Sequence, residues 1–248
     1  MNTHTEIFLT RLHEMDVDHL LRVQCICNYM EEAAGRHAEL LGVGLERLDR
    51  DALAWVLAKM RLSLSRRPGP GERILIETWP VKLERLQFRR DFIIRGDNGD
   101  ILATAVTQWV VMGLESRKLE RFPLYIAAMA PENPPLAQEC GDIRIPALPA
   151  EGAVQGPLFP VRLADIDQNR HVNNGRYVDF VLEAADCRGA TGSLAELEIL
   201  FRSEGKRGDV IGSRSKAGDE PGVLTHSLYR ESDGQELARA RTVHGQQF

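Results

Sequence analysis

The densest group of chemically capable side chains lies in the ten residues 165–174, DIDQNRHVNN, which hold carboxylates, amides and one imidazole. In an extended stretch, Asp167, Asn169 and His171 fall at alternate positions and share one face. A histidine flanked by a carboxylate and an amide is a candidate general acid or base. The alternative is a turn that ends in a helix cap, with Asn173 or Asn174 as the capping residue and the other side chains solvated.

A helix is expected directly after this segment, over about 174–188. Tyr177, Phe180, Val181 and Ala184 follow one another at helical spacing and form its apolar face. The backbone N–H groups at its start, near Asn174 and Gly175, are positioned to stabilise a developing anion, because the positive end of a helix favours negative charge. These two residues are therefore predicted to form an oxyanion site.

The two halves of the chain resemble one another. Asp16-Val17-Asp18 matches Asp165-Ile166-Asp167, and each motif precedes a helical pattern that contains Glu-Ala-Ala. In this register Arg22 takes the place of His171, and Leu20 takes the place of Asn169. The first half is therefore predicted to be catalytically silent.

Each half is expected to contain a strand, one long helix and about four antiparallel strands, which is an α+β unit whose sheet wraps its helix. The first helix is expected over about 24–41. Alternating residues from Val56 to Leu64 predict a half-buried strand. Hairpins are predicted at the turn signals 97–99 and 233–234, which separate apolar segments.

Proline usage divides the chain. Eight of the twelve prolines lie between Pro123 and Pro160, and a segment so poor in backbone N–H groups does not form a central strand or a long helix. Residues 123–157 are therefore predicted to be a surface linker, with one short helix near 124–129. The expected domains are 1–122 and 158–248.

The segment N-x-H-V-N-N-x-x-Y at 169–177 resembles the signature of the acyl-acyl carrier protein thioesterases, and the resemblance extends over nearly the whole chain. It implies a tandem double hot-dog fold. No cofactor and no metal ion are expected, because the sequence has no zinc-site spacing of cysteines, no H-E-x-x-H motif and no glycine-rich nucleotide motif. The resemblance also implies a catalytic network of Asp167, Asn169, His171 and Glu204. Some plant members have a cysteine directly after this glutamate, whereas Gly205 stands here, so that cysteine is not essential if this protein is active.

The resemblance implies hydrolysis of the thioester of fatty acyl-acyl carrier protein by activated water. Glu204, with His171 and Asn169, is expected to orient and deprotonate the water, and Asp167 to orient the imidazole. Which of Glu204 and His171 is the base stays open. Cys187, in the helical pattern, is expected to be a small buried residue and not a nucleophile.

The resemblance also implies that the first half supplies the acyl-chain pocket. Met30, Val56, Met60 and Trp109 are the candidates for lining it, and the alternative is that each is an ordinary core residue. An acyl carrier protein is acidic and this chain has a net charge of −5, so binding is expected to use a local basic patch. The candidate patch residues, which could also be scattered surface charges, are Arg66, Arg67, Lys82, Arg85, Arg89, Arg90, Lys206 and Arg207.

Three other functions stay open: an acyl-CoA thioesterase, a dehydratase, and a non-catalytic acyl-binding protein, all on the same fold. A homodimer is allowed but not required. Composition excludes several other classes. The acidic balance, with a pI of about 5.8, argues against a nucleic-acid-binding protein. Apolar stretches such as 101–112 are too short to span a membrane. No signal peptide is recognised, and four cysteines without a zinc-site spacing are typical of thiols in a reducing cytoplasm.

Overall fold

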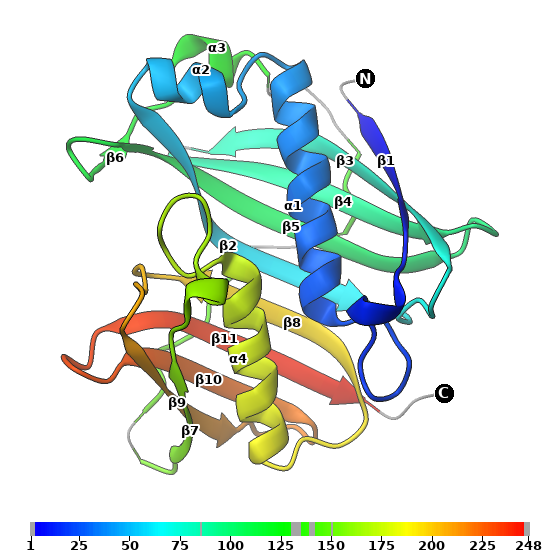
Figure 1. Ribbon diagram of the computed structural model, residues 1–248, viewed down its shortest axis with the longest axis vertical. Coiled ribbons are helices and arrows are strands. Elements are labelled where there is room, and N and C mark those ends of the chain that lie inside the picture. The colour runs from blue at the N-terminus through cyan, green and yellow to red at the C-terminus, as the bar shows by residue number, and fades with distance from the viewer. Residues whose placement is uncertain (1–2, 85, 130–134, 139–141, 150, 246–248) are drawn as a thin grey trace. The chain divides into compact units, whose positions relative to one another are not determined.

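The computed structural model describes residues 3–84, 86–129, 135–138, 142–149 and 151–245 (Figure 1). The chain divides into two compact units, Met1–Gly141 and Asp142–Phe248. Each unit has a strand, a long helix and four further long strands in the same order. This confirms the predicted α+β class and the order of elements within each repeat.

The first unit is a curved antiparallel sheet with α1 (Val23–Leu40) packed on one face (Figure 1). Its strands lie in the order β1-β3-β4-β5-β2, and the short β6 pairs with β5. The remaining elements are β1 (His4–Leu9), α2 (Leu45–Arg50), β2 (Leu53–Leu64), β3 (Arg73–Glu84), β4 (Gln87–Gly96), β5 (Ile101–Gly113), β6 (Leu119–Glu120) and α3 (Leu124–Ala127).

The second unit repeats this arrangement with α4 (Asn174–Cys187), which packs against four strands of its sheet (Figure 1). The strands lie in the order β8-β11-β10-β9-β7. They are β7 (Val154–Pro160), β8 (Ser193–Phe201), β9 (Val210–Ala217), β10 (Val223–Arg230) and β11 (Glu236–Gly245).

Both long helices bury one apolar face against their own sheet, as their sequences predict. On α4 the predicted face is buried at all four positions. A stacked aromatic pair joins each helix to the strand that precedes it: Phe8 with Tyr29 at 4.4 Å between ring centroids, and Phe159 with Phe180 at 4.5 Å. The repeat is therefore visible in side-chain packing as well as in the order of elements.

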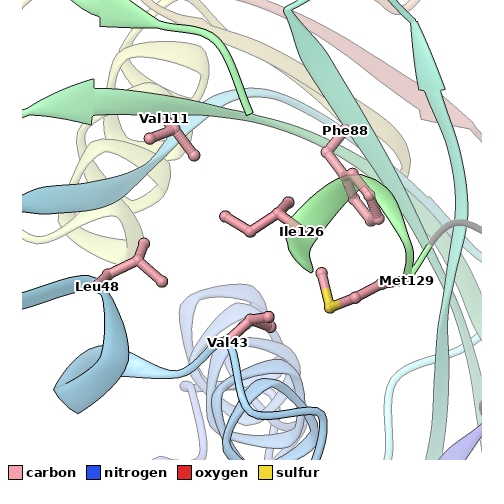
Figure 2. Packing of buried hydrophobic residues seen from close by; sticks show 6 residues of the cluster. All are labelled: Val43, Leu48, Phe88, Val111, Ile126 and Met129. Carbon is pink, nitrogen blue, oxygen red and sulfur yellow. The ribbon is translucent and has the colours of Figure 1, made fainter. Parts of the chain in front are cut away.

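One hydrophobic cluster of the first unit lies beyond the C-terminal end of α1. Figure 2 shows its six side chains gathered around Ile126, which is fully buried. Ile126 and Met129 come from α3 and the residues after it, so the beginning of the predicted 123–157 linker packs into the first unit. At its other end that segment enters β7, which starts at Val154. The cluster consists of Val43, Leu48, Phe88, Val111, Ile126 and Met129.

A second part of the predicted linker, 135–138, lies against the sheet of the first unit. The backbone N–H of Ala137 donates to Asp91 Oδ2 at 2.8 Å, and Arg89 Nη2 donates to the carbonyl of Gln138 at 3.0 Å. Beneath this segment Arg89 and Asp91 form a two-bond ion pair of 2.7 and 2.9 Å. The interior of the unit therefore holds a charged pair covered by linker residues.

The predicted basic patch is wrong at Arg89 and Arg90, which are only 8% and 6% exposed. Arg90 lies on the α1 side of β4, where its Nη1 atom contacts His37 Nδ1 at 3.0 Å. Burial, followed by the nearby Arg90 charge, lowers the pKa of His37 to about 4. The side chains of β4 point alternately to the two faces of the sheet, and both faces are covered, one by α1 and the other by residues 135–138. The sequence of β4 alone does not show this cover. Of the other candidates, Arg85 lies outside the described residues.

Candidate active site

The central feature of the candidate site is a contact between His171 and Glu204. His171 Nε2 lies 3.0 Å from Glu204 Oε2. His171 comes from the turn before α4, and Glu204 from the turn after β8. Their side chains are 22% and 35% exposed, so water and a substrate can reach both. The structure thus brings together two of the four predicted catalytic residues, 33 positions apart in the chain (204 minus 171).

The predicted extended conformation of 167–171 is wrong, because these residues form a tight turn. Ile166 and Val172 pair as an antiparallel bridge. Between them the N–H of Asp167 donates to the carbonyl of His171 at 2.9 Å. Arg170 has a φ of 65°, in the left-handed region, which reverses the chain.

The carboxylate of Asp167 takes part in this turn. Its Oδ1 atom accepts a hydrogen bond from the backbone N–H of Asn169 at 2.8 Å, as in an Asx turn. Asn169 lies exposed within the turn. Asp167 therefore fixes the backbone that presents His171, and a direct contact with the imidazole is not among the hydrogen bonds of this described segment. Its predicted role, and that of Asn169, stay proposals.

The start of α4 bears out the capping interpretation for Asn173. The side chain of Asn173 accepts a hydrogen bond from the N–H of Gly175 at 2.8 Å. The cap and the His171–Glu204 contact are therefore present together, where the sequence left them as alternatives. Because the N–H of Gly175 is occupied by the cap, the predicted oxyanion contact at Gly175 requires Asn173 to turn away. Asn174 is the first residue of the helix.

Sequence reasoning gave no role to a buried ion pair that fixes this helix start. Asp165 is only 4% exposed. It accepts from Arg176 Nε at 2.8 Å and from the backbone N–H of Arg162 at 2.8 Å. The signal was present in the sequence, since Asp165 belongs to the singled-out motif and Arg176 lies within the N-x-H-V-N-N-x-x-Y pattern.

Three hydrogen bonds to backbone atoms hold the turn that carries Glu204, one from the backbone and two that involve side chains. The carbonyl of Gly205 accepts from the N–H of Val172 at 2.9 Å. The N–H of Gly205 donates to Tyr177 Oη at 2.9 Å, and Arg230 Nη2 donates to the carbonyl of Glu204 at 2.9 Å. Burial raises the pKa of Tyr177 to about 12, so its hydroxyl is neutral. Arg230 was not predicted, because nothing in the sequence near it points to this loop.

Three of the four predicted acyl-contact residues are on surfaces that face one another in the first unit. Met30 is buried on α1, and Met60 and Trp109 lie on the side of the sheet that faces α1. Val56 does not join them, because it pairs with Val110 on the other face. A β-bulge between Leu57 and Lys59 breaks the alternation that the sequence suggested.

The first unit contains a turn that matches 166–172, but in a different register from the predicted one. Met15 and Leu21 form the bridge that Ile166 and Val172 form in the second unit. The N–H of Asp16 donates to Leu20 at 2.8 Å, as that of Asp167 does to His171. The predicted match of Val17 with Ile166 is wrong because Val17 is 94% exposed. The position of His171 therefore belongs to Leu20, and Arg22 is equivalent to the capping Asn173.

The same comparison identifies the residue equivalent to Glu204. The N–H of Leu21 donates to the carbonyl of Pro68, as that of Val172 does to Gly205. Arg67 therefore stands where Glu204 stands, and it forms an ion pair with Asp16. Burial raises the pKa of Asp16, but the Arg67 hydrogen bond and neighbouring backbone N–H groups lower it overall. This turn has neither a histidine nor a carboxylate at the two key positions, which supports the expectation that the first half is silent.

The family of the chain follows from models of two consecutive domains. The acyl-ACP thioesterase N-terminal domain matches residues 1–129, and the acyl-ACP thioesterase C-terminal domain matches residues 151–246. The chain belongs to the acyl-ACP thioesterase family. Its fold is the hot-dog fold, as the sequence predicted.

Curated relatives and a solved structure agree with this assignment. The chloroplastic acyl-[acyl-carrier-protein] hydrolase FATB2 of Cuphea viscosissima is 29% identical over 252 residues, covering 95% of this chain and 61% of that protein. The chloroplastic oleoyl-acyl carrier protein thioesterase 1 of Arabidopsis thaliana is 29% identical over 275 residues, covering 97% and 75%. The structure of the 12:0-ACP thioesterase from Umbellularia californica has a TM-score of 0.83 and 25% identity, covering 98% of this chain and 97% of that chain. The chain spans about three-fifths of the length of the first curated relatives it matches, 61% and 60%.

Two further observations concern membrane-spanning helices and the described cysteines. Across the described residues, none of the helices has the length and apolar character needed to cross a membrane. Cys25 and Cys27 are buried thiols, but Cys187 is exposed at the end of α4. The expectation that Cys187 is buried is therefore wrong: it occupies the last turn of the helix, beyond the face that packs on the sheet.

Proposed function

We propose that this protein hydrolyses the thioester of fatty acyl-acyl carrier protein and releases a free fatty acid and the carrier-protein thiol. The observation that carries the proposal is the 3.0 Å contact of His171 with Glu204 at an accessible position, in a chain of the acyl-ACP thioesterase family. The relatives named above act on acyl carrier protein substrates, as their names state.

The reaction needs no covalent intermediate. Water bound at the His171–Glu204 pair loses a proton to the pair as its oxygen attacks the thioester carbon. The C–S bond then breaks, and the pair returns the proton to the departing thiolate. Asn169 helps to orient the water, and Asp167 fixes the turn that carries His171. The carbonyl oxygen, negative in the transition state, is held at the start of α4 by Asn174, and by Gly175 when Asn173 releases its N–H.

The acyl chain is proposed to bind in the first unit, on the side of the sheet that faces α1. Met30, Met60 and Trp109 support this location because all three belong to the two apolar surfaces that meet there. Val56 is not included, since it lies on the other face. A fatty acyl chain requires an apolar surface of this kind, although Arg90 and His37 also lie between α1 and the sheet.

The carrier protein is proposed to bind at exposed cations beside the catalytic pair. Arg170 precedes His171, and Lys206 and Arg207 follow Glu204, and all three are exposed. Arg66 and Arg67 are instead engaged in ion pairs with neighbouring carboxylates. A local basic surface on a chain of net charge −5 favours an acidic partner. Cys25, Cys27 and Cys187 are thiols, which is typical of proteins of a reducing cytoplasm, and we propose that the protein acts there.

The deciding experiment measures thiol release from a series of medium- to long-chain acyl-carrier-protein thioesters beside the matching acyl-CoAs. His171→Ala is expected to lower kcat/KM by roughly 100-fold or more, because it removes an acid-base group. Leu20→Ala, at the equivalent position of the first unit, is the matched control and should keep wild-type activity. Cleavage of the CoA series alone would favour the acyl-CoA alternative. Cleavage of neither series would refute the proposed hydrolysis and direct attention to a dehydratase or a binding protein.

A further inference from the structure

The contact between His171 and Glu204 is part of a closed ring of interactions. His171 continues to Val172, whose N–H bonds the carbonyl of Gly205, and Gly205 follows Glu204, which returns to His171. Tyr177 is not a member of this ring of interactions, but its hydroxyl oxygen accepts a hydrogen bond from the N–H of Gly205 at 2.9 Å. The phenol therefore holds the peptide that joins Gly205 to Glu204.

The Tyr177 ring is itself fixed. It is 3% exposed and makes edge-to-face contacts with Phe201 at 5.8 Å and Phe180 at 6.3 Å between ring centroids. A buried aromatic side chain packed in this way keeps one rotamer. Its hydroxyl is therefore a rigid reference point for the turn that carries Glu204.

The first unit shows what replaces this hydrogen bond where no catalytic pair is present. Because Leu20 matches His171, the residue that matches Tyr177 on α1 is Ile26, which has no hydroxyl. The residue that matches Gly205 is Pro68, which has no N–H to satisfy. The first unit has neither a histidine nor a carboxylate at the positions of the catalytic pair, and it also lacks both the donor and the acceptor of this hydrogen bond.

Gly205 also has little room for another side chain. A Cβ atom there would lie 2.9 Å from Tyr177 Oη and 3.1 Å from Val172 Cγ2. The tyrosine hydroxyl and the glycine backbone are therefore fitted closely to one another. A hydrogen bond needed only for folding could be replaced, as it is in the first unit, by an apolar residue and a proline.

We infer that Tyr177 is a positioning residue for the proposed hydrolysis: its hydroxyl holds the Gly205 peptide so that the Glu204 carboxylate meets His171. The inference rests on the proposed function. Tyr177 does not touch the reacting atoms and transfers no proton. Its effect on the rate passes entirely through the placement of Glu204.

The test is a double-mutant cycle of Tyr177→Phe and Glu204→Gln. Tyr177→Phe keeps the packed ring and removes only the hydroxyl. In the wild-type background it is expected to lower kcat by about 10- to 100-fold, since small misplacements at a reacting centre have effects of this size, with KM almost unchanged. In the Glu204→Gln background it should have almost no further effect. Tyr29→Phe is the matched control, because it removes a hydroxyl that donates to Glu14 at 2.5 Å in the first unit.

Several results would overturn the inference. Tyr177→Phe could leave kcat unchanged, or it could lower kcat by the same factor in both backgrounds, as a general structural effect would. If the wild type hydrolyses no thioester, the proposed function fails and NMR decides the positioning separately. The side-chain Nε2 resonance of His171 should then move in Tyr177→Phe toward its position in Glu204→Gln, while Tyr29→Phe leaves it in place. A His171 resonance unchanged by Tyr177→Phe would refute the positioning role.

Discussion

The buried ion pair of Arg89 and Asp91 gives a quantitative prediction for stability. Asp91 is fully buried and holds Arg89 through bonds of 2.7 and 2.9 Å. Replacing Arg89 by methionine leaves a buried carboxylate with one remaining bond, from the N–H of Ala137 at 2.8 Å. Breaking one side of a buried pair costs about 3–5 kcal/mol. The bond from Ala137 places Arg89→Met at the lower end, about 3 kcal/mol.

For a chain of this size about 3 kcal/mol corresponds to a fall in Tm of roughly 6–12 °C. The assay is thermal and urea denaturation of Arg89→Met, with Arg207→Met at an exposed position as the control. Arg89→Met combined with Asp91→Leu should recover much of the lost stability, because no unpaired charge remains. An Arg89→Met protein that melts within 2 °C of the wild type, at about the same Tm as the control, would refute the reasoning. A raised KM for carrier-protein substrates with an unchanged Tm would restore Arg89 as a docking residue.

The remaining predictions concern pH and docking. Burial lowers the pKa of His226 to about 3, and hydroxyl groups of Ser215 and Thr242 contact its two ring nitrogens at 2.8 and 3.0 Å. Below about pH 6.5 the unfolded chain takes up a proton at this histidine and the folded chain does not. The free energy of unfolding therefore falls as pH decreases, by about 2 kcal/mol at pH 5. Urea denaturation at pH 7 and pH 5 should show a smaller loss of this free energy in His226→Gln than in the wild type. Charge reversal at Lys206 and Arg207 is expected to raise KM for carrier-protein substrates several-fold at low salt, with kcat and Tm unchanged; an unchanged KM would remove this surface from consideration.

Local patterns were enough to predict the elements and the segment that carries His171. The helix expected over 174–188 is found at Asn174–Cys187, and the hairpin expected at 97–99 joins β4 to β5. Apolar spacing and turn residues act over a few positions, so one sequence contains them. The contact of His171 with Glu204 was reached differently, since the family resemblance singled out Glu204 and nothing in its own neighbourhood did.

The features that were missed depend on where a residue lies in three dimensions. The sequence matched Asp16-Val17-Asp18 with Asp165-Ile166-Asp167 because the letters agree. Ile166 takes part in a bridge with Val172, however, whereas Val17 is 94% exposed. A shift of two residues keeps the acidic pattern and changes every equivalence after it, so Leu20, and not Arg22, takes the place of His171.

The corrected register also explains why one unit can lose a catalytic pair without losing its fold. The turn needs an aspartate that starts it, a residue with positive φ and a bridge that closes it. The first unit keeps all three, with Asp16, His19 and the Met15–Leu21 bridge. His171 and Glu204 contribute nothing that the turn requires, since Leu20 and Arg67 stand at their positions in an equivalent turn. The fold therefore forms this turn in both units, and the chemistry depends on the few side chains, at the positions of His171 and Glu204, that the turn does not require.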